Sequence, residues 1–482
     1  MNVVLTRPDY NTHIISPPMG IGYISSYLKK YGHKTKIVDG VNLGLSNSEI
    51  VRRCEEFDAK LVGIYILSAF FLNAVDLIKK LQEKGFKIVL GGAHPTFMPK
   101  FTIEKSGADF IVVEEAEKAM LDLVNALEKN EPTDKIPGVY TMSGGFIPRK
   151  ATTNLDEFPF PDWEQIDPRK YKKAPHGGFI RNFPYAPMSA TRGCPYRCTF
   201  CASPKFSSRS IRFRSPENVV AEIKYLVDNF GIKEVHFEDD NLTLWRDFAM
   251  KICNLIIEQG IKISWACPNG VRADKVDLEL LKLMKKSGCY YVAFGIESGN
   301  QEILDNVKKD LRLEDVERAA RLAHKVGIMT QGFFIFGLPG ETEETIEKTI
   351  KFAKSIPLTR AQFLILDVMP GTELWDTLNF EERVDWTKNS YHEITWTPPT
   401  VSPEALANSA PRAFKEFYMR PRQLFSILRY VRPQQIPFLV KRLKDIGVLS
   451  FGNNGHNGHK MSQMGGIEKK QMGQMVEEVV TS

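Results

Sequence analysis

The sequence predicts an α/β protein: an N-terminal doubly wound, Rossmann-like domain, then a partial (β/α)6 barrel of the TIM type and a helical C-terminal region. Two observations lead to this fold class. Short β-branched runs alternate with amphipathic helical patterns over residues 1–130, and the alternation returns after residue 186 with six further strand patterns. Strands that alternate with helices are typical of parallel sheets. Six strand–helix units in about 180 residues indicate an incomplete barrel, because eight units take about 250 residues.

The N-terminal domain, expected over residues 1–130, has five strand patterns and five helical patterns. The strands are expected at 3–5, 36–39, 61–66, 87–91 and 110–113, and the helices at 20–31, 47–57, 72–84, 99–106 and 116–127. The short apolar strands are typical of a parallel sheet that is covered on both faces. In such a sheet a ligand binds beyond the carboxyl ends of the strands.

The remaining chain divides into four segments. Residues 131–185 are rich in Pro, Asp and aromatic side chains and are expected to form an ordered linker, since flexible linkers contain few aromatics. The barrel is expected over 186–374, with strands at 188–191, 234–238, 262–267, 290–295, 330–336 and 362–368 and helices that include 216–229, 280–287 and 341–355. A helical, aromatic region follows at 375–451, and the Gly-, Asn- and His-rich tail 452–482 is expected to be disordered.

The composition is that of an ordinary globular protein, with 43% hydrophobic and 25% charged residues. The net charge of +6 is spread without a dense basic block, so no nucleic-acid partner is expected. The N-terminus has no signal-peptide pattern and the apolar stretch 61–75 is too short to span a membrane, so we expect a cytoplasmic protein. Basic and aromatic residues in the C-terminal region leave peripheral membrane contact open.

Three of the seven cysteines lie within eight residues, in the segment Arg-Gly-Cys-Pro-Tyr-Arg-Cys-Thr-Phe-Cys. Cys194, Cys198 and Cys201 have the spacing C-x3-C-x2-C. Such clustering favours metal ligation in a reducing compartment over a disulfide framework. Three thiolates can hold three corners of a [4Fe–4S] cluster and leave the fourth iron open to another ligand. Structural zinc is the alternative, but it needs four ligands, and no fourth ligand lies nearby in the sequence.

This segment, with Phe200 directly before the last cysteine, resembles the signature of the radical S-adenosylmethionine (SAM) superfamily. The resemblance implies a barrel whose first strand leads into the cluster loop. It also implies that SAM binds the open iron of the [4Fe–4S] cluster. One-electron reduction, from a donor such as flavodoxin or ferredoxin, would then give a 5′-deoxyadenosyl radical that abstracts hydrogen from the substrate.

Polar residues and glycines follow the predicted barrel strands where the superfamily binds SAM. Carboxylates after the second strand can accept hydrogen bonds from an ammonium group, and a glycine after the fifth lets the backbone approach a ligand closely. The resemblance implies SAM contacts from Phe200, Glu238, Asp239, Asp240, Arg272, Glu297, Ser298 and Gly337.

Four segments of the first domain, residues 17–23, 31–39, 91–95 and 112–117, resemble the cobalamin-binding domain of cobalamin-dependent radical SAM enzymes. The resemblance implies cobalamin contacts from Ser68, Gly91, Gly92, His94, Glu115 and Glu117. Two features depart from the family pattern. The Asp-x-His-x-x-Gly motif that supplies a lower axial histidine is missing, and Glu114 stands where the family commonly has glycine.

This pairing of domains implies methyl transfer to an unactivated carbon of a small-molecule or lipid-like substrate, through the 5′-deoxyadenosyl radical and methylcobalamin. Two other interpretations stay open. The first is a non-methylating enzyme, cyclase-like or ring- or lipid-modifying, because parts of residues 391–421 resemble the anaerobic cyclase group. The second is a protein that binds cobalamin and an iron–sulfur cluster without catalysis. A methylthiotransferase is disfavoured, since it needs three further N-terminal cysteines and this domain has only Cys54.

Overall fold

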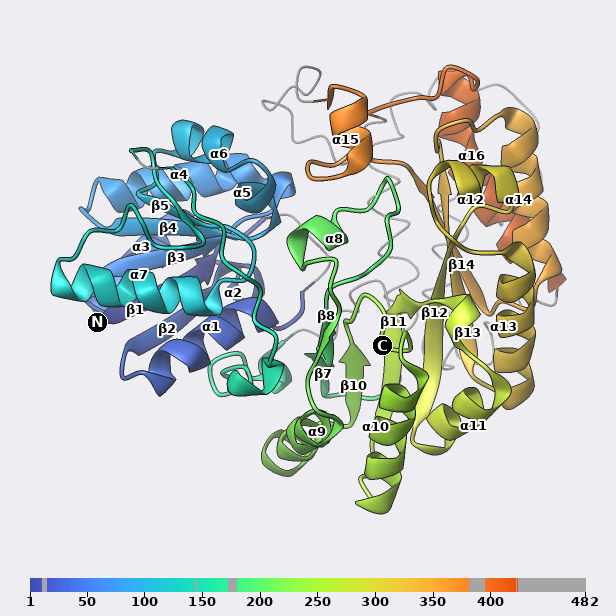
Figure 1. Cartoon of the computed structure of the whole chain (residues 1–482), viewed down its shortest axis with the longest axis horizontal. Coiled ribbons are helices and arrows are strands. Elements are labelled where there is room, and N and C mark those ends of the chain that lie inside the picture. The colour runs from blue at the N-terminus through green and yellow to red at the C-terminus, as the bar shows by residue number, and fades with distance from the viewer. Residues whose placement is uncertain (11–14, 144, 172–179, 381–394, 422, 424–482) are drawn as a thin grey trace, which may run out of the picture.

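The computed structural model describes residues 1–10, 15–143, 145–171, 180–380, 395–421 and 423. The expected tail 452–482 and residues 424–451 of the expected helical region lie outside the described residues. Figure 1 shows two α/β units next to each other, with the short helix α8 (Ser203–Phe206) between them.

The N-terminal unit is a six-stranded sheet with the strand order β2-β1-β3-β4-β5-β6. Its strands are β1 (Asn2–Arg7), β2 (Lys34–Asp39), β3 (Leu61–Tyr65), β4 (Lys87–Gly91), β5 (Phe110–Val112) and β6 (Val139–Tyr140). The first five strands pair in parallel, which confirms the predicted doubly wound sheet. The order reverses between β1 and β3, and ligands of such sheets bind at this switch point.

Helices cover both faces of this sheet. Alternate residues of a strand point to opposite sides, so each face presents apolar residues that a helix can cover. Val3 and Leu5 pack with the helices of one face, and Val4 packs with those of the other. The first face carries α1 (Met19–Lys30) and α7 (Glu117–Lys129); the second carries α3 (Asn47–Glu56), α4 (Phe71–Gln82) and α6 (Pro99–Ser106). The short helices α2 (Gly40–Leu43) and α5 (Ala93–Phe97) follow β2 and β4.

The sheet continues into the segment expected to be a linker, because β6 pairs antiparallel with β5. The residues that follow join the two units. Trp163 is buried in the barrel core, where its indole N–H donates to Glu222 Oε1 (2.9 Å). Its neighbour Asp162 accepts a hydrogen bond from Ser25 Oγ on α1 (2.7 Å). The aromatic composition of this segment therefore reflects packing against both units.

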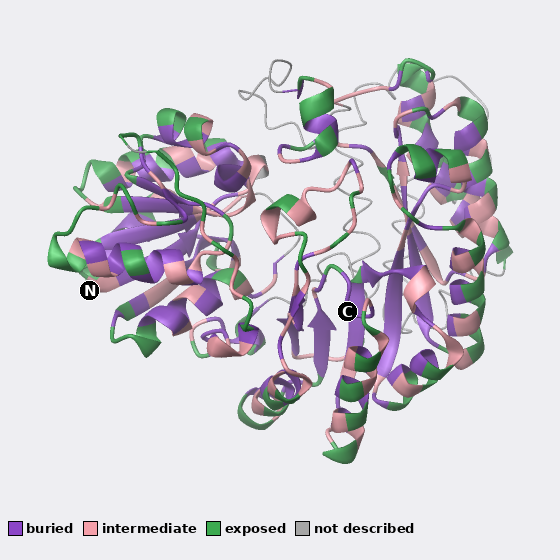
Figure 2. Ribbon diagram, in the orientation of Figure 1, coloured by how far each residue is buried: buried purple, intermediate pink, exposed green. Residues whose placement is uncertain are grey.

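The second unit is a six-stranded parallel sheet whose neighbours follow the chain order, which confirms the predicted partial barrel. Its strands are β7 (Tyr185–Met188), β10 (Glu234–Phe237), β11 (Ser264–Val271), β12 (Cys289–Glu297), β13 (Met329–Phe336) and β14 (Arg360–Ile365). The helices outside it are α9 (Pro216–Phe230), α10 (Arg246–Glu258), α11 (Leu278–Lys286), α13 (Leu313–Val326) and α14 (Glu343–Ser355). Figure 2 shows the strands buried and the outer faces of these helices exposed.

Among the barrel strands, β11 extends furthest beyond its predicted end. β11 extends to Val271, whereas its predicted strand ended at Cys267. The intervening residues include proline and glycine, which are depleted in strands. The pairing with β12 shifts its register between Cys267 and Val271. The sheet therefore accommodates these residues by an irregularity in the pairing of β11 with β12.

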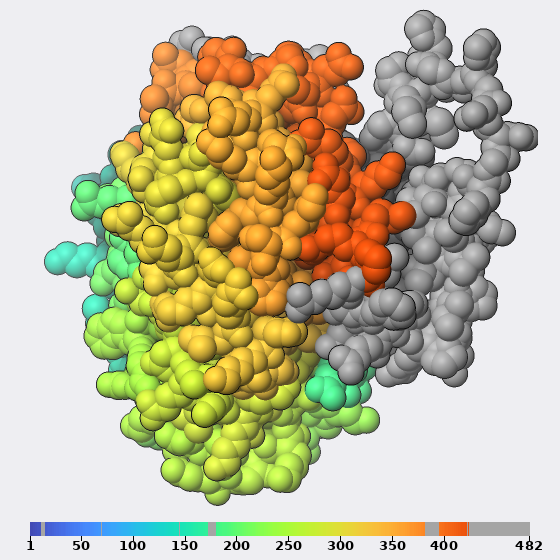
Figure 3. All heavy atoms as spheres, turned by 90° about the vertical axis from the view of Figure 1, so that its right-hand side faces the viewer, coloured from blue at the N-terminus to red at the C-terminus, as the bar shows by residue number. Residues whose placement is uncertain are grey.

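The remaining elements are short. β8 (Thr191–Arg192) and β9 (Arg212–Phe213) form a two-stranded antiparallel ribbon, while α12 (Gln301–Asn306) and α15 (Glu373–Thr377) follow β12 and β14. The helix α16 (Pro403–Tyr418) lies against α14 and β14 at the edge of the barrel (Figure 3), where the Tyr418 hydroxyl donates to the Ala361 carbonyl (2.9 Å). Within the described part of the chain, no helix combines the length and the hydropathy needed to cross a bilayer.

Candidate active site between the two domains

The predicted iron–sulfur segment forms a loop between β8 and α8, which we call the cluster loop (residues 193–202). Its three cysteines, Cys194, Cys198 and Cys201, are free and partly exposed. Gly193 begins the loop with a φ of +97°, and a Cβ there would lie 2.6 Å from the Ser210 carbonyl oxygen. Because no side chain fits, glycine is required at the position that turns the chain into the first cysteine.

The cluster loop is fastened to the barrel by backbone and side-chain contacts. The Thr199 N–H donates to the Val307 carbonyl, and the Thr199 carbonyl accepts from the Leu374 N–H, each at 3.0 Å. The guanidinium of Arg272 lies 3.6 Å from the centre of the Tyr196 ring, a close cation–π contact. These anchors hold the loop above the carboxyl ends of the barrel strands.

The three thiols fit a [4Fe–4S] cluster better than zinc. Zinc draws its sulfur ligands within about 4 Å of one another, because each Zn–S bond is about 2.3 Å long. Among the described residues, no group of three or more His, Cys, Asp or Glu side chains is arranged to hold one metal ion. In a cluster each thiolate binds its own iron. Burial raises the pKa of the Cys201 thiol to about 12, so its thiolate depends on the positive charge of a bound metal.

The three carboxylates predicted to follow the second barrel strand stand at the end of β10. Asp239 is buried, and its carboxylate accepts hydrogen bonds from the backbone N–H of Ala190 (3.0 Å) and from Thr191 Oγ1 (2.6 Å). Burial raises the pKa of Asp239 to about 6. The hydrogen bonds that Asp239 accepts from Ala190 and Thr191 position the chain that leads into the cluster loop. Asp240 accepts from Ser203 Oγ on α8, and Glu238 lies beside them.

Arg272 and Glu297 are engaged with protein groups near the cluster loop. Arg272 pairs with Asp274 (Nε–Oδ1 2.8 Å) and donates to the Lys309 carbonyl (2.9 Å). Glu297, the last residue of β12, pairs with Lys309 Nζ at 2.7 Å, and both side chains are largely buried. Lys309 Nζ also lies 5.9 Å from the centre of the Phe200 ring. Two ion pairs and the Phe200 ring therefore stand on this side of the loop.

The remaining SAM candidates are buried or backbone groups. Ser298 is fully buried, and its hydroxyl lies 3.2 Å from Thr349 Oγ1, so its side chain faces the protein interior. Gly337, after β13, has a φ of +88°, and its N–H donates to the Glu341 carboxylate. Burial raises the pKa of that carboxyl to about 7.

A cavity of about 420 Å³ lies between the two units, and we call it the interdomain cavity. On one side it is lined by the carboxyl edge of the N-terminal sheet, including Gly91, Gly92, Glu115 and Glu117. On the other side it is lined by the β8 and β10 ends, including Arg192, Glu238, Asp239 and Asp240. Apolar residues of β1, β3, β4 and α1 form its floor. This is the edge at which the strand order predicts a ligand.

The backbone after β4 shows why glycines stand there. Gly92 has a φ of +109°, and a Cβ would lie 2.5 Å from the Ile66 carbonyl oxygen and 3.0 Å from the Tyr65 ring. Glycine is therefore required. A Cβ on Gly91 would meet nothing within 4 Å, so the backbone there borders open space into which a large ligand can approach.

Two of the predicted cobalamin residues lie elsewhere. Ser68 and His94 do not line the interdomain cavity; Ser68 Oγ and His94 Nδ1 lie 2.9 Å apart beneath the loop after β4. His94 is buried, which lowers its pKa to about 4. The hydrogen bond of this pair ties the segment after β3 to the segment after β4.

Glu115 and Glu117 form ion pairs that join the two units. Arg212 on β9 donates to both oxygens of Glu115, at 2.8 and 2.6 Å. Arg192 on β8 pairs with Glu117 at 2.7 Å. The guanidinium of Arg192 also lies 5.2 Å from the centre of the Tyr23 ring of α1. These arginines hold both ends of the cluster-loop segment against the N-terminal domain.

The sequence reasoning missed both arginines. Arg192 directly precedes the Gly-Cys that opens the motif, and Arg212 stands in an alternating basic segment that ends at Arg214. Each position carried a basic charge next to a cluster motif. Nothing in the pattern connected either charge to acidic residues about 75 to 97 positions earlier.

The residues of the interdomain cavity fit cobalamin. The cavity stands at the switch point of a doubly wound sheet, has an apolar floor and opens at Gly91, where backbone replaces side chains. Glu114 keeps a left-handed φ of +64° although it is not glycine. The loop after β5 therefore keeps a turn that suits glycine.

Comparison with known proteins agrees with this arrangement. The sequence profile of the radical SAM superfamily matches residues 188–353, and that of the B12 binding domain matches residues 11–124. An uncharacterised methyltransferase of Pyrococcus horikoshii is 32% identical, over 88% of this chain and 94% of its own length. The cytidylyl-2-hydroxyethylphosphonate methyltransferase of Streptomyces wedmorensis is 30% identical, over 74% of this chain and 77% of its own. An anaerobic magnesium-protoporphyrin IX monomethyl ester cyclase of Cereibacter sphaeroides is 28% identical, over 87% and 71%.

Two solved structures share the fold. The radical SAM methyltransferase TsrM of Kitasatospora setae, solved with cobalamin and a [4Fe–4S] cluster, superposes with a TM-score of 0.68 at 18% identity, over 98% of this chain and 99% of that one. OxsB, solved with aqua-cobalamin and SAM, gives a TM-score of 0.71 at 19% identity, over 99% and 80%. The two matched domains in this order, the cysteine loop and the 32% identical relative that aligns over 88% of this chain show that the chain belongs to the cobalamin-dependent radical SAM enzymes, whose cofactors are a [4Fe–4S] cluster, SAM and cobalamin.

Proposed function

We propose that this chain transfers a methyl group to an unactivated carbon of a small organic substrate. The observation that carries the proposal is the interdomain cavity, whose walls are the cobalamin edge of one domain and the strand ends beside the cluster loop of the other. When bound, SAM and the cluster supply a substrate radical, and cobalamin carries the methyl group that the radical accepts. Two relatives that align over most of this chain are named methyltransferases.

Each group of residues has a separate task in this proposal. The cysteines of the cluster loop hold the cluster, and Glu238 and Asp240 bind the amino group of SAM at the end of β10. Asp239 positions the backbone that leads into the loop, since its carboxylate accepts from Ala190 and Thr191. The backbone at Gly91 and Gly92 borders cobalamin. A flavodoxin- or ferredoxin-like protein supplies the electron.

The side chains at the carboxyl ends of the barrel strands exclude water from the loop and keep charged groups beside it. Arg272 and Lys309 bring two cations close to the cluster loop, and each is already held by a carboxylate, at Asp274 and Glu297. The two ion pairs fix these side chains in position beside the thiolate-bound iron. We propose that these residues keep the loop in place, while the remaining SAM candidates, Phe200, Ser298 and Gly337, shape the site around it.

The test is anaerobic reconstitution with iron, sulfide and hydroxocobalamin, followed by reduction in the presence of SAM labelled in its methyl group. Methyl transfer predicts both S-adenosylhomocysteine and 5′-deoxyadenosine, with label recovered in cobalamin. Cys198→Ala should lose 5′-deoxyadenosine, because the cluster loses a ligand. Cys253→Ala is the matched control, since Cys253 is buried in the barrel core outside the cluster loop.

The outcomes separate the alternatives. Formation of 5′-deoxyadenosine without S-adenosylhomocysteine would favour a non-methylating, cyclase-like reaction, for which the similarity to the anaerobic cyclases is the supporting observation. Neither product from fully loaded protein would favour a binding protein without catalysis. Equal 5′-deoxyadenosine from Cys198→Ala and wild type would remove the cluster assignment.

A further inference from the structure

Arg192 belongs to the barrel unit, but its side chain lines the interdomain cavity together with residues of the cobalamin domain. The side chain is 18% exposed. Only Gly193 separates this residue from Cys194, the first cysteine of the cluster loop. One side chain therefore borders the cobalamin cavity while its backbone leads directly into the cluster loop. The sequence reasoning assigned Arg192 to neither cofactor.

The guanidinium of Arg192 is held in place before any ligand binds. Its Nη2 donates to Glu117 Oε1 at 2.7 Å. The guanidinium also lies 5.2 Å from the ring centre of Tyr23 on α1 and 5.2 Å from that of Phe158 in the linking segment. An ion pair and two cation–π contacts therefore fix its orientation. A guanidinium that is already oriented loses little conformational entropy when it donates to a ligand.

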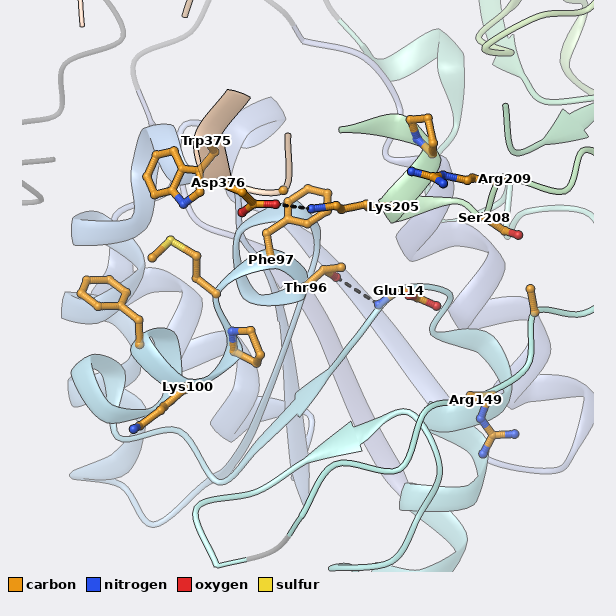
Figure 4. A pocket seen from close by; sticks show the side chains of 16 residues that line it. Thr96, Phe97, Lys100, Glu114, Arg149, Lys205, Ser208, Arg209, Trp375 and Asp376 are labelled. Atoms are coloured by element: carbon orange, nitrogen blue, oxygen red, sulfur yellow. Dashed lines mark hydrogen bonds and ion pairs between the residues drawn. The ribbon is translucent and has the colours of Figure 1, made fainter. Parts of the chain in front are cut away.

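The carboxylate partner of Arg192 is also held in place. Glu117 is the first residue of α7, and only 5% of its side chain is exposed. The loop before it is fastened at Glu114, whose backbone N–H donates to Thr96 Oγ1 at 3.0 Å. Figure 4 shows this contact at the edge of a second, neighbouring cavity. The helix and this loop contact therefore keep Glu117 beside Arg192.

Both members of this ion pair have hydrogen-bonding capacity left over. Within the described part of the chain, Arg192 Nε makes no hydrogen bond, and Nη1 only approaches Glu115 Oε1 at 3.7 Å. Among the same described residues, none donates to Glu117 Oε2. Both side chains line the interdomain cavity, so a ligand in that cavity can reach these unused atoms.

The charges around the pair cancel, which favours a neutral ligand group. Glu117 balances Arg192, and Arg212 balances the neighbouring Glu115. The unused guanidinium N–H groups need an acceptor, and the unused carboxylate oxygen needs a donor. A primary amide supplies both, through its carbonyl oxygen and its NH2 group. A phosphate supplies only acceptors and would lie next to two carboxylates. Cobalamin, which the cavity fits, carries primary amides around the rim of its corrin ring.

We propose that Arg192 and Glu117 together bind a side-chain amide of cobalamin. The guanidinium donates to the amide carbonyl, and the carboxylate accepts from the amide N–H. Because Arg192 lies two residues before Cys194, bound cobalamin also holds the start of the cluster loop, so each cofactor favours the binding of the other. This inference goes beyond the proposed function, since it concerns how the cofactors are held and not which group is transferred.

The amide contact is tested by anaerobic equilibrium dialysis of the cluster-loaded protein against hydroxocobalamin. The matched control for Arg192→Gln is Arg212→Gln, which removes the other interdomain arginine at a position that is not part of the cavity lining. Both substitutions loosen the domain contact, so the difference between them reports the amide contact. Arg192→Gln should bind hydroxocobalamin about 10-fold more weakly than Arg212→Gln, because it also removes a charge-assisted hydrogen bond to the ligand.

Two further measurements complete the test. Circular dichroism checks that each variant is folded, and Arg192→Lys keeps the positive charge beside Glu117 but not the planar set of N–H donors. This variant should unfold at the same urea concentration as wild type and bind hydroxocobalamin several-fold more weakly. The link between the cofactors is measured by the same dialysis on protein without its cluster. Cluster-loaded wild type should bind hydroxocobalamin about 5-fold more tightly than cluster-free wild type, and this ratio should be close to one for Arg192→Gln.

Two results would overturn the inference. Equal losses of affinity in Arg192→Gln and Arg212→Gln would show that Arg192 only joins the domains. A wild-type affinity for hydroxocobalamin that does not depend on the cluster would remove the link between the two cofactors. These measurements need no turnover, so they fail separately from the proposed function. Protein with the expected affinities that makes no S-adenosylhomocysteine refutes methyl transfer alone, and equal losses in protein that makes both nucleoside products refute this inference alone.

Discussion

Breaking the ion pair between Glu115 and Arg212 is expected to loosen the contact between the cobalamin domain and the cluster loop. The pair has two short N–O distances, 2.8 and 2.6 Å, and only 5% of the Arg212 side chain and 18% of the Glu115 side chain are exposed. Removing one partner of a fully buried pair costs about 3–5 kcal/mol. Glu115 keeps some solvent, and Arg212 also donates to the Thr152 and Ser207 carbonyls. We therefore expect a loss of about 2 kcal/mol for Glu115→Gln.

The assay is a double-mutant cycle of Glu115→Gln and Arg212→Gln, with urea unfolding followed by circular dichroism and by cobalamin release. We expect a coupling energy of about 1–2 kcal/mol and faster loss of cobalamin from each variant. The control cycle uses Arg321 and Glu317 on α13, which are 60% and 46% exposed and should couple by at most about 0.5 kcal/mol. If the two interdomain substitutions act additively within about 0.3 kcal/mol, the pair does not join the domains and the reasoning is refuted.

Three further changes test the site. Burial raises the pKa of Glu341 to about 7, so the contribution of its protonated form to stability is complete below the ordinary carboxyl pKa and is lost as the pH rises through 7. Between pH 5 and 8 the free energy of unfolding of wild type should therefore fall by roughly 2–3 kcal/mol relative to that of Glu341→Gln. Parallel pH profiles of the two proteins would contradict this. Gly92→Ala should cost about 1–3 kcal/mol and weaken cobalamin binding, because its Cβ would lie 2.5 Å from the Ile66 carbonyl oxygen; unchanged affinity by absorbance titration would argue against this steric role. Cys198→Ala should bind less iron and sulfide per chain than wild type by elemental analysis, and equal loading would show that Cys198 is not a ligand.

The fold could be predicted because the strands and helices of both units follow local sequence patterns. Each parallel strand is a short apolar run, and the helices between the strands have amphipathic periodicity. The differences arose where tertiary contacts override local preference. β6 has only two residues and exists because β5 offers it a partner. β11 runs past Cys267 through proline and glycine because β12 can absorb the shift in register.

The site residues that lie close together in the sequence could be predicted. The three cysteines could be assigned because their spacing encodes the geometry of one loop. Ser68 and His94 follow strand ends, as ligand-binding residues do, but the structure turns them toward each other. Glu115 and Glu117 do reach the cavity, but their partners, Arg192 and Arg212, come from the other domain. An ion pair between residues that are far apart in the sequence produces no periodic pattern in that sequence.

The arrangement of these charges explains how one chain keeps its two cofactor sites in a fixed position relative to each other. The cluster loop starts after Arg192 and returns to the sheet ribbon at Arg212, and each arginine is bound to a carboxylate of the cobalamin domain. On the barrel side, Asp239 holds the backbone just before the same ribbon. Both ends of the segment 192–212, which contains the cluster loop, are therefore fixed to the domain that carries the other cofactor. A change in the separation of the domains has to break a largely buried ion pair, so these pairs hold the cobalamin domain and the cluster-loop segment at a fixed separation.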